Sequence, residues 1–247
     1  MTKNKWIIGN WKMNGSQSLV QEFENILSDL HIPAHIQVGI APPFPYLPLL
    51  KTMDNTIRIG AQNISQFDQD GAFTGEINSR MLQDCGATFV LIGHSERRTL
   101  FGETDNQLHQ KTQNTLNAGL IPVYCVGENL SVRQTGQENE FISSQLEIIL
   151  PLLTLDTPFL IAYEPVWAIG TGEVATQEQI SAMHEHIRQF LLSKEINTDN
   201  IFILYGGSVN AENAQHILKL PNVDGALIGG AALKTEQFIR IIKAVEN

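Results

Sequence analysis

The sequence predicts an α/β protein whose single domain, residues 1–247, is a (β/α)8 barrel. Short apolar runs alternate with longer amphipathic segments along the whole chain, and this alternation is typical of βαβ units. Eight such units in 247 residues match the usual size of a closed barrel. Polar residues and glycines directly follow these runs, as in barrels that place their chemistry at the carboxyl ends of the strands.

The expected strands are four to six residues long, rich in β-branched or aromatic residues and almost free of charge. Such composition is typical of parallel strands that are buried on both faces. They are residues 6–9, 37–41, 57–61, 89–93, 121–126, 159–163, 201–205 and 225–229.

Helices are expected where apolar residues recur every three or four positions, as Leu19, Phe23 and Ile26 do. The expected helices are residues 17–30, 138–150, 177–196, 211–220 and 235–245. The proline-rich stretch 42–48 is expected to form a rigid connection from strand to helix. A doubly wound open sheet is the alternative, but it often carries a Gly-x-Gly-x-x-Gly turn after its first strand, which this sequence lacks.

Composition narrows the possible partners. The net charge of -10 argues against nucleic acid or an anionic membrane surface, and any anionic substrate would need a local cation or backbone amides to bind. Cys85 and Cys125 lack metal-ligand spacing and are expected to be reduced thiols of a cytoplasmic protein. We expect no signal peptide and no membrane span, because no apolar stretch is long enough.

The residues that follow the strands include groups able to carry chemistry. They are Asn10, Lys12, Gln62, Asn63, His94, Ser95, Glu96, Gly127, Glu128, Glu164, Gly206, Gly207, Ser208, Gly229 and Gly230. Each has an ordinary alternative: Lys12 could be solvated and His94 could be a core histidine with its hydrogen bonds satisfied. A Lys, a His and a Glu on one rim of a barrel nevertheless indicate an active site.

The segment after the sixth strand is the most informative. Glu164 ends an apolar strand, Pro165 stops it, and an apolar loop follows up to Gly170 and Gly172. This pattern indicates a catalytic base under a lid that excludes water. A solvated carboxylate in a surface loop is an equally good interpretation of this segment by itself.

Two glycine pairs indicate a phosphate site. Gly206-Gly207 and Gly229-Gly230 follow the last two strands, where barrels often bind phosphate, and each pair is expected to precede a helix. Backbone N–H groups and a helix N-terminus would then face the phosphate. The alternative is that these glycines only permit tight turns.

Seven segments resemble the triosephosphate isomerase family, and the resemblance covers essentially the whole chain. They are residues 9–14 (GNWKMN), 60–63 (GAQN), 71–76 (GAFTGE), 93–98 (GHSERR), 162–172 (AYEPVWAIGTG), 205–209 (YGGSV) and 224–230 (DGALIGG). The resemblance implies an isomerase that interconverts dihydroxyacetone phosphate and D-glyceraldehyde 3-phosphate through an enediolate, in glycolysis and gluconeogenesis.

The resemblance also implies roles for individual residues. Glu164 would be the base, and His94 a neutral electrophile whose pKa a helix N-terminus lowers. Lys12 and Asn10 would bind substrate oxygens, with Glu96 in a supporting role. Apolar pressure from Ile169 and Leu227 would raise the pKa of Glu164. Phosphate would be bound by Gly170, Ser208, Gly229 and Gly230. The lid would be Pro165, Val166, Trp167, Ala168, Ile169, Gly170, Thr171 and Gly172.

The family resemblance further implies a homodimer that needs no metal or organic cofactor. Residues 66–76 would insert into the partner subunit, with Thr74, Gly75 and Glu76 in contact. A simple turn is the alternative for Thr74-Gly75-Glu76. The chain departs from the family pattern at Glu173, where Lys is frequent, and at Ala232 and Asn78, where Ser is frequent.

Two rival functions are open to test. A different phosphosugar enzyme, such as a Schiff-base aldolase, would need a Lys at a strand end inside the barrel, whereas Lys12 and Lys234 lie beyond strands. A catalytically idle binding protein with this fold would be expected to have lost its base or its electrophile, and both are present.

Overall fold

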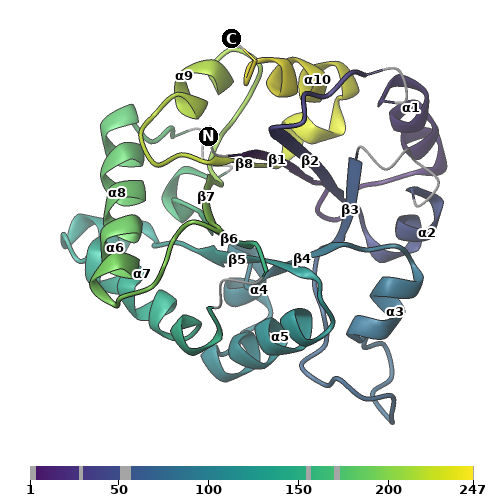
Figure 1. Ribbon diagram of the computed structural model, residues 1–247, viewed down its shortest axis with the longest axis horizontal. Coiled ribbons are helices and arrows are strands. Elements are labelled where there is room, and N and C mark those ends of the chain that lie inside the picture. Colours follow the sequence, from purple (N-terminus) through teal and green to yellow (C-terminus); the bar gives the residue numbers. More distant parts are fainter. Residues whose placement is uncertain (1–3, 28–29, 51–56, 154–156, 170–172, 247) are drawn as a thin grey trace.

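The computed structural model describes residues 4–27, 30–50, 57–153, 157–169 and 173–246. Its strands follow one another in chain order around a closed parallel barrel, with helices on the outside (Figure 1). The strands are β1 (Lys5–Asn10), β2 (Ile36–Ala41), β3 (Ile57–Ala61), β4 (Phe89–Ile92), β5 (Ile121–Val126), β6 (Phe159–Tyr163), β7 (Ile201–Tyr205) and β8 (Gly225–Ile228). The predicted fold class is therefore confirmed.

The barrel closes between its first and last strands. Ile7 of β1 lies opposite Val38 of β2 on one side and opposite Ala226 of β8 on the other, both in parallel register. Because every strand has a neighbour on each side, the sheet exposes no edge that another chain could extend. The carboxyl ends of all the strands consequently meet at one rim.

Two separate cores explain why the strands read as continuous apolar runs. Trp6 and Ile8 of β1 point into the barrel, where they belong to a cluster with Phe89 and Leu204. Ile7, between them, belongs to the larger cluster packed under the helices. Successive side chains of a strand point to opposite faces, so a barrel strand buries both sets.

Inside the barrel, the ring of Phe89 fits because its two neighbours Gly39 and Gly60 have no Cβ atom. A Cβ at Gly60 would stand 2.2 Å from the ring of Phe89, and one at Gly39 would stand 2.8 Å from it. Glycines at these positions therefore make room for Phe89 to fill the interior, which must be packed because it is not a pore.

The helices cover the outer face of the barrel. They are α1 (Gln17–Leu27), α2 (Leu47–Leu50), α3 (Ser79–Asp84), α4 (Ser95–Leu100), α5 (Asp105–Asn117), α6 (Leu130–Gln134), α7 (Glu138–Glu147), α8 (Gln177–Ser193), α9 (Ala214–Leu218) and α10 (Thr235–Lys243). Short 3-10 turns occur at η1 (Phe44–Tyr46), η2 (Leu150–Leu152), η3 (Val166–Ala168) and η4 (Gly230–Leu233). The proline-rich stretch contributes η1 and the start of α2, so it does connect a strand to a helix.

Helix boundaries were predicted less well than strands. The helix expected to reach residue 150 ends at Glu147, before the proline of η2, and the one expected from residue 211 begins only at Ala214. Helix α5 was not predicted, because polar side chains such as Thr112, Asn114 and Thr115 occupy its buried face. Its one clear sequence signal is the capping box of Thr104 and Gln107.

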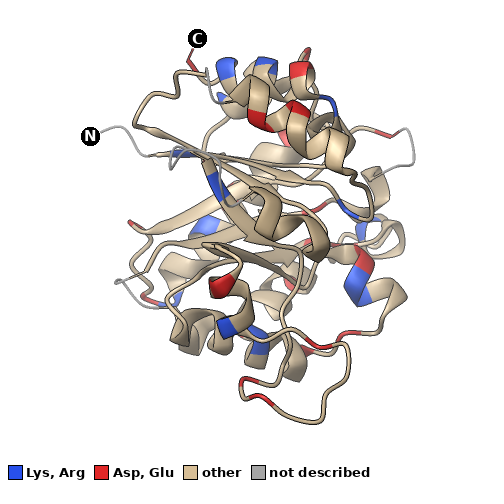
Figure 2. Ribbon diagram, turned by 90° about the vertical axis from the view of Figure 1, so that its right-hand side faces the viewer, with Lys and Arg blue, Asp and Glu red and all other residues tan. Residues whose placement is uncertain are grey.

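A long loop between β3 and α3 extends away from the barrel, and acidic positions mark it in the side view (Figure 2). Within it the rings of Phe67 and Phe73 stack at a centroid distance of 3.9 Å. Asn78 closes the loop by accepting a hydrogen bond from the Met81 N–H, which begins α3, and by donating one to Asp70. An Asn is thus an effective helix cap where the family pattern has Ser.

Candidate active site

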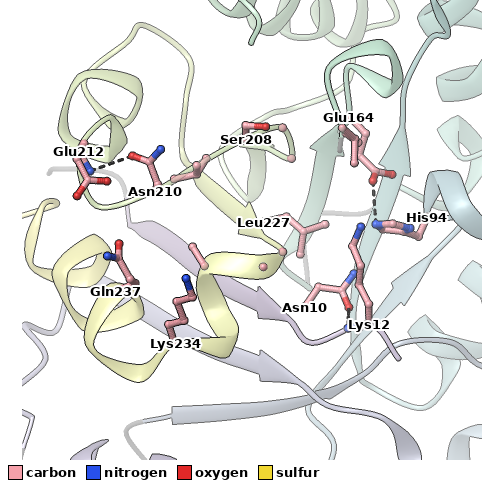
Figure 3. A pocket seen from close by; sticks show the side chains of 17 residues that line it. Asn10, Lys12, His94, Glu164, Ser208, Asn210, Glu212, Leu227, Lys234 and Gln237 are labelled. Carbon is pink, nitrogen blue, oxygen red and sulfur yellow. Dashed lines mark hydrogen bonds and ion pairs between the residues drawn. The ribbon is translucent and has the colours of Figure 1, made fainter. Parts of the chain in front are cut away.

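A cavity of about 510 Å³ opens at the carboxyl ends of the strands and collects most of the predicted site residues (Figure 3). Its predicted lining residues are Asn10, Lys12, His94, Glu164, Ile169, Ser208, Leu227, Gly229 and Gly230. They come from β1, β4, β6, β7 and β8 or from the loops that follow them. The barrel topology therefore gathers into one cavity groups that are far apart in the chain.

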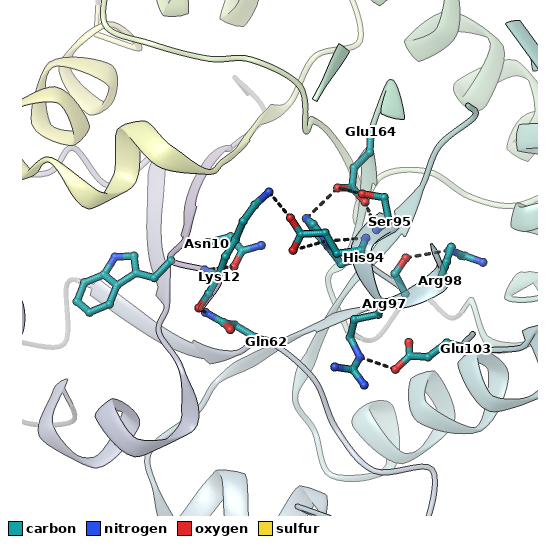
Figure 4. A network of polar contacts seen from close by, with 12 residues as sticks. Asn10, Lys12, Gln62, His94, Ser95, Arg97, Arg98, Glu103 and Glu164 are labelled. Carbon is teal, nitrogen blue, oxygen red and sulfur yellow. Dashed lines mark hydrogen bonds and ion pairs between the residues drawn. The ribbon is translucent and has the colours of Figure 1, made fainter. Parts of the chain in front are cut away.

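Lys12 has an unusual backbone conformation that its neighbours hold in place. Its φ angle is 53°, in the left-handed region that few residues other than glycine adopt. The Asn10 side chain accepts a hydrogen bond from the Lys12 N–H at 2.9 Å. The Gln62 amide donates to the Lys12 carbonyl at 2.9 Å (Figure 4). It also donates to the Ala41 carbonyl at 2.8 Å. Strain of this kind at a cavity wall is typical of functional sites.

The ammonium group of Lys12 is directed by Glu96. Lys12 Nζ lies 2.6 Å from Glu96 Oε1, and both side chains are partly exposed. Glu96 itself does not line the cavity, so its contact with Lys12 is what connects it to the site. A charge-assisted hydrogen bond of this length fixes the direction of the Lys12 ammonium group, which the flexible side chain of Lys12 would not fix by itself.

Glu164 is almost completely buried at the end of β6, with 1% of its surface exposed. Its backbone N–H donates to the Val126 carbonyl of the neighbouring strand at 2.7 Å. Its carboxylate accepts from the Ser95 N–H at 2.9 Å and from the Ser95 hydroxyl at 3.1 Å. The Nε2 atom of His94 lies 2.9 Å from Glu164 Oε1.

These contacts correct the predicted pKa of Glu164. Burial alone would raise the pKa, but the neighbouring His94 ring, and the hydrogen bonds from His94 and Ser95, hold it below its ordinary value. Ile169 and Leu227 do line the same cavity. In this arrangement, however, the carboxylate is kept ionised by its donors and is not made more basic by apolar pressure.

His94 begins helix α4 as its N-cap, and its ring nitrogens have different partners. Nδ1 accepts a hydrogen bond from the Glu96 N–H at 3.3 Å. In the neutral ring the proton is therefore on Nε2, which points to Glu164.

The direction predicted for the pKa of His94 is also corrected. Burial would lower the pKa, but the nearby Glu164 carboxylate, and to a smaller degree Glu96, raise it above its ordinary value. The helix N-terminus was expected to decide this pKa in the opposite direction. A carboxylate at 2.9 Å outweighs it as long as Glu164 stays in contact with the ring.

The glycine turns after β7 and β8 reach the cavity, but they do not both precede long helices. After Gly206 and Gly207 the chain continues to Ala214 before the five-residue α9 begins. Gly230 starts only the single turn η4. A Cβ at Gly229 would stand 3.6 Å from the Lys12 side chain, and one at Gly230 would meet nothing within 4 Å. An anion at these turns would therefore be bound by unobstructed backbone N–H groups next to Lys12, and less by the dipole of a helix.

The predicted lid begins as a short ordered turn. Pro165 precedes η3, and the indole of Trp167 donates to Glu128 Oε1 at 2.9 Å. The Ser208 hydroxyl donates to the Ala168 carbonyl at 3.3 Å, which connects the first part of the lid to the turn after β7. The remaining predicted lid residues, Gly170, Thr171 and Gly172, lie outside the described residues.

Several residues at the site had no role in the sequence-based prediction. Gln62 and Glu128 were noted only as rim residues, although they hold Lys12 and Trp167. Asn210, Lys234 and Gln237 also line the cavity. Their position after strand ends was a usable signal for Gln62 and Glu128, but nothing local marks the other three.

The residues predicted for a subunit contact lie on the protruding loop, away from the cavity. Thr74, Gly75 and Glu76 are exposed, and Gly75 has a φ of 92°. A shallow groove of about 280 Å³ runs between this loop and the α4–α5 region, lined among others by Phe73, Thr74 and Phe101. Of the other departures, Ala232 is fully buried and Glu173 is exposed.

Comparisons with known proteins point to one family. The family model described as Triosephosphate isomerase matches residues 5–245. A protein named triosephosphate isomerase from Neisseria meningitidis is 46% identical, and one from Colwellia psychrerythraea is 40% identical, each over 100% of both chains. The protein of that name from Francisella philomiragia is 44% identical over 96% of both chains. Within the described residues, none of the helices is both long enough and apolar enough to cross a membrane.

Proposed function

The chain belongs to the triosephosphate isomerase family and interconverts dihydroxyacetone phosphate and D-glyceraldehyde 3-phosphate, and we propose that Glu164 is the base that moves the proton. The observation that supports this assignment is the shared cavity, which brings a carboxylate, an imidazole and an ammonium group together. We also propose that all of residues 1–247 form this one barrel domain, that the protein is cytoplasmic, and that the reaction serves glycolysis and gluconeogenesis.

Glu164 has to change partners during the reaction. In the structure its carboxylate is bonded to Ser95 and His94, so no oxygen is directed at a substrate carbon. When the substrate binds, the carboxylate leaves these donors and takes a proton from the carbon next to the carbonyl. Leaving them removes the groups that lower its pKa, while burial, which raises it, persists. Its basicity thus rises at the moment when it meets the substrate.

His94 changes in the complementary way. Once Glu164 moves away, the largest influence raising the pKa of His94 is gone, and burial together with Lys12 favours the neutral ring. Because Nδ1 accepts the Glu96 N–H, the Nε2–H is free to donate to the substrate carbonyl oxygen. A neutral donor aimed at that oxygen stabilises the enediolate as its charge develops.

The remaining groups bind and enclose the substrate. Lys12 and Asn10 supply a cation and an amide to the substrate oxygens, and Glu96 orients Lys12. The open backbone of Gly229 and Gly230, with Ser208, receives the phosphate. Gly170 completes the phosphate site from the lid, residues 165–172, which closes over the reacting carbons and excludes water.

Replacing Glu164 with Gln tests this assignment because Gln has nearly the same shape but cannot accept the proton. We expect kcat to fall about 10³-fold in a coupled assay with glyceraldehyde 3-phosphate, as when a positioned base is removed. Glu178→Gln is the matched control, since Glu178 is an exposed carboxylate in the first turn of α8. Equal rates for Glu164→Gln and the control would remove Glu164 from the mechanism.

We further propose that two copies of the chain associate through the face that carries residues 66–76. This face exposes large apolar side chains that line one groove: Phe101 at 67%, Phe73 at 40% and Phe67 at 39%. Exposed apolar surface of this extent is typical of a subunit interface, and two-fold dimers are the commonest assembly. Thr74 would then approach Asn10 and Lys12 of the other copy.

Introducing a charge at the tip of the loop tests the dimer. In sedimentation experiments we expect the wild type at twice the chain mass and Thr74→Arg at the mass of one chain, with reduced activity. Gln137→Arg adds the same charge at an exposed position between α6 and α7 and should remain dimeric. A wild-type protein that is fully active as a monomer would refute the proposal.

A further inference from the structure

The cavity is larger than its reactive end and extends outward to a second charged group. Glu164 and His94 lie at one end, and Lys234 and Gln237 lie at the other, near Asn210 (Figure 3). A three-carbon sugar phosphate that contacts Glu164 does not need the outer end of a cavity of about 510 Å³. Residues at the outer end can therefore interact with the substrate before the substrate reaches Glu164.

The charges that line this cavity are unequally compensated. Lys12 Nζ is 2.6 Å from a Glu96 oxygen, so its charge is offset by a carboxylate. Glu212 is similarly paired, 3.3 Å from Arg240. Across the part of the chain that the structure describes, Lys234 forms no ion pair, and its side chain is exposed. The carboxylate that lines the same cavity, Glu212, is thus paired with Arg240, and the charge of Lys234 acts on the cavity mouth.

This charge matters because the rest of the molecule opposes the substrate. The net charge of the chain is -10. A phosphate monoester carries a charge between about -1.5 and -2 at neutral pH. A cation at the mouth of a cleft focuses the field there and raises both the local concentration of an anion and its rate of entry.

We propose that Lys234 recruits the phosphate dianion of the triose phosphate to the mouth of the cavity. It takes no part in proton transfer, which occurs at the opposite end. This inference rests on the proposed function, since it requires an anionic substrate that reacts at Glu164. It makes Lys234 a residue for substrate capture, distinct from Lys12 beside the reacting atoms.

Lys234 can be changed without disturbing the fold. It is the N-cap of α10, but its side chain makes no capping hydrogen bond. Its backbone carbonyl accepts the Phe238 N–H at 3.0 Å, and any side chain leaves that bond in place. Substitution therefore alters charge and little else.

The test measures kcat and KM for glyceraldehyde 3-phosphate at several ionic strengths in the wild type, Lys234→Gln and Lys234→Glu. At an ionic strength of about 20 mM we expect kcat/KM to fall about threefold for Lys234→Gln and about tenfold for Lys234→Glu, because the second change is twice as large in charge. Near 0.5 M, where screening acts within about 5 Å, both variants should come within about 1.5-fold of the wild type. The losses should appear in KM, with kcat unchanged.

Lys219→Gln is the matched control. Lys219 is exposed, does not line the cavity, and its loss changes the net charge by the same amount. We expect it to keep kcat/KM within about 1.3-fold of the wild type at every salt concentration. Equal losses for Lys234→Gln and Lys219→Gln, a loss that persists at high salt, or a loss in kcat would each overturn the proposal. A wild-type protein without turnover would instead contradict the proposed function, so the two failures are distinguishable.

Discussion

Replacing Gln62 with Met should lower the activity about 30-fold, because Gln62 holds the strained backbone of Lys12. Met is close to Gln in length and volume but donates no hydrogen bond. The substitution removes the bonds to the Lys12 carbonyl at 2.9 Å and to the Ala41 carbonyl at 2.8 Å. The Ala41 carbonyl keeps its bond from the Trp11 N–H, so the main change falls on Lys12.

The expected magnitude follows from these contacts. Without the Gln62 donor the partly buried Lys12 carbonyl is left unpaired, which costs about 1–3 kcal/mol, with about 2 kcal/mol as the middle value. The left-handed backbone of Lys12, with a φ of 53°, is itself unfavourable by about 1–3 kcal/mol and needs such support. If the lost 2 kcal/mol is expressed as a preference of Lys12 for other conformations, kcat/KM falls by about 30-fold, since about 1.4 kcal/mol corresponds to a factor of ten.

The assay is coupled turnover of glyceraldehyde 3-phosphate, with urea unfolding of the same preparations to measure stability. Gln21→Met is the matched control, because Gln21 is exposed on α1 and its amide donates to the neighbouring side chains of Glu24 and Asn25. We expect the control to stay within about 0.5 kcal/mol of the wild type in stability and to keep its activity. A Gln62→Met protein with wild-type kcat/KM would show that Lys12 keeps its position without Gln62, and the reasoning would be wrong.

Two further predictions concern stability. His184 is fully buried, and burial lowers its pKa to about 4. As the pH drops from 6.5 to 4, this histidine is therefore protonated in the unfolded chain while it stays neutral in the folded one. The free energy of unfolding should fall by up to about 3 kcal/mol over this range. Urea unfolding of His184→Gln across this range should show a smaller fall, and an unchanged pH dependence would contradict the assignment. Asn78→Ala removes the cap of α3, which costs about 1 kcal/mol, and in a calorimetric scan we expect Tm to fall by about 2–4 °C. Asn78→Ser keeps a capping side chain and should leave Tm nearly unchanged in the same scan. A fall in Tm as large for Asn78→Ser as for Asn78→Ala would show that the cap is not what stabilises α3.

The strands were predictable because barrel strands bury both faces. Ile121–Val126 and Phe159–Tyr163 have the predicted bounds, since a run of apolar residues with no charge has few other places in a folded chain. Helices were less predictable where their buried face is polar, as in α5. Hydrophobic periodicity cannot detect a face formed by Thr and Asn side chains whose hydrogen bonds are satisfied locally.

The sequence by itself determined which groups reach the rim of the barrel, because a residue that follows a strand must lie at that strand's carboxyl end. Only the tertiary structure decided what those groups do to one another. Glu164 and Ser95 are 69 positions apart in the chain but are joined by hydrogen bonds of 2.9 and 3.1 Å. Electrostatic and hydrogen-bonding effects depend steeply on such distances. The pKa shifts of Glu164 and His94 run opposite to the directions that the family resemblance implied, because the barrel brings the ends of β4 and β6 together.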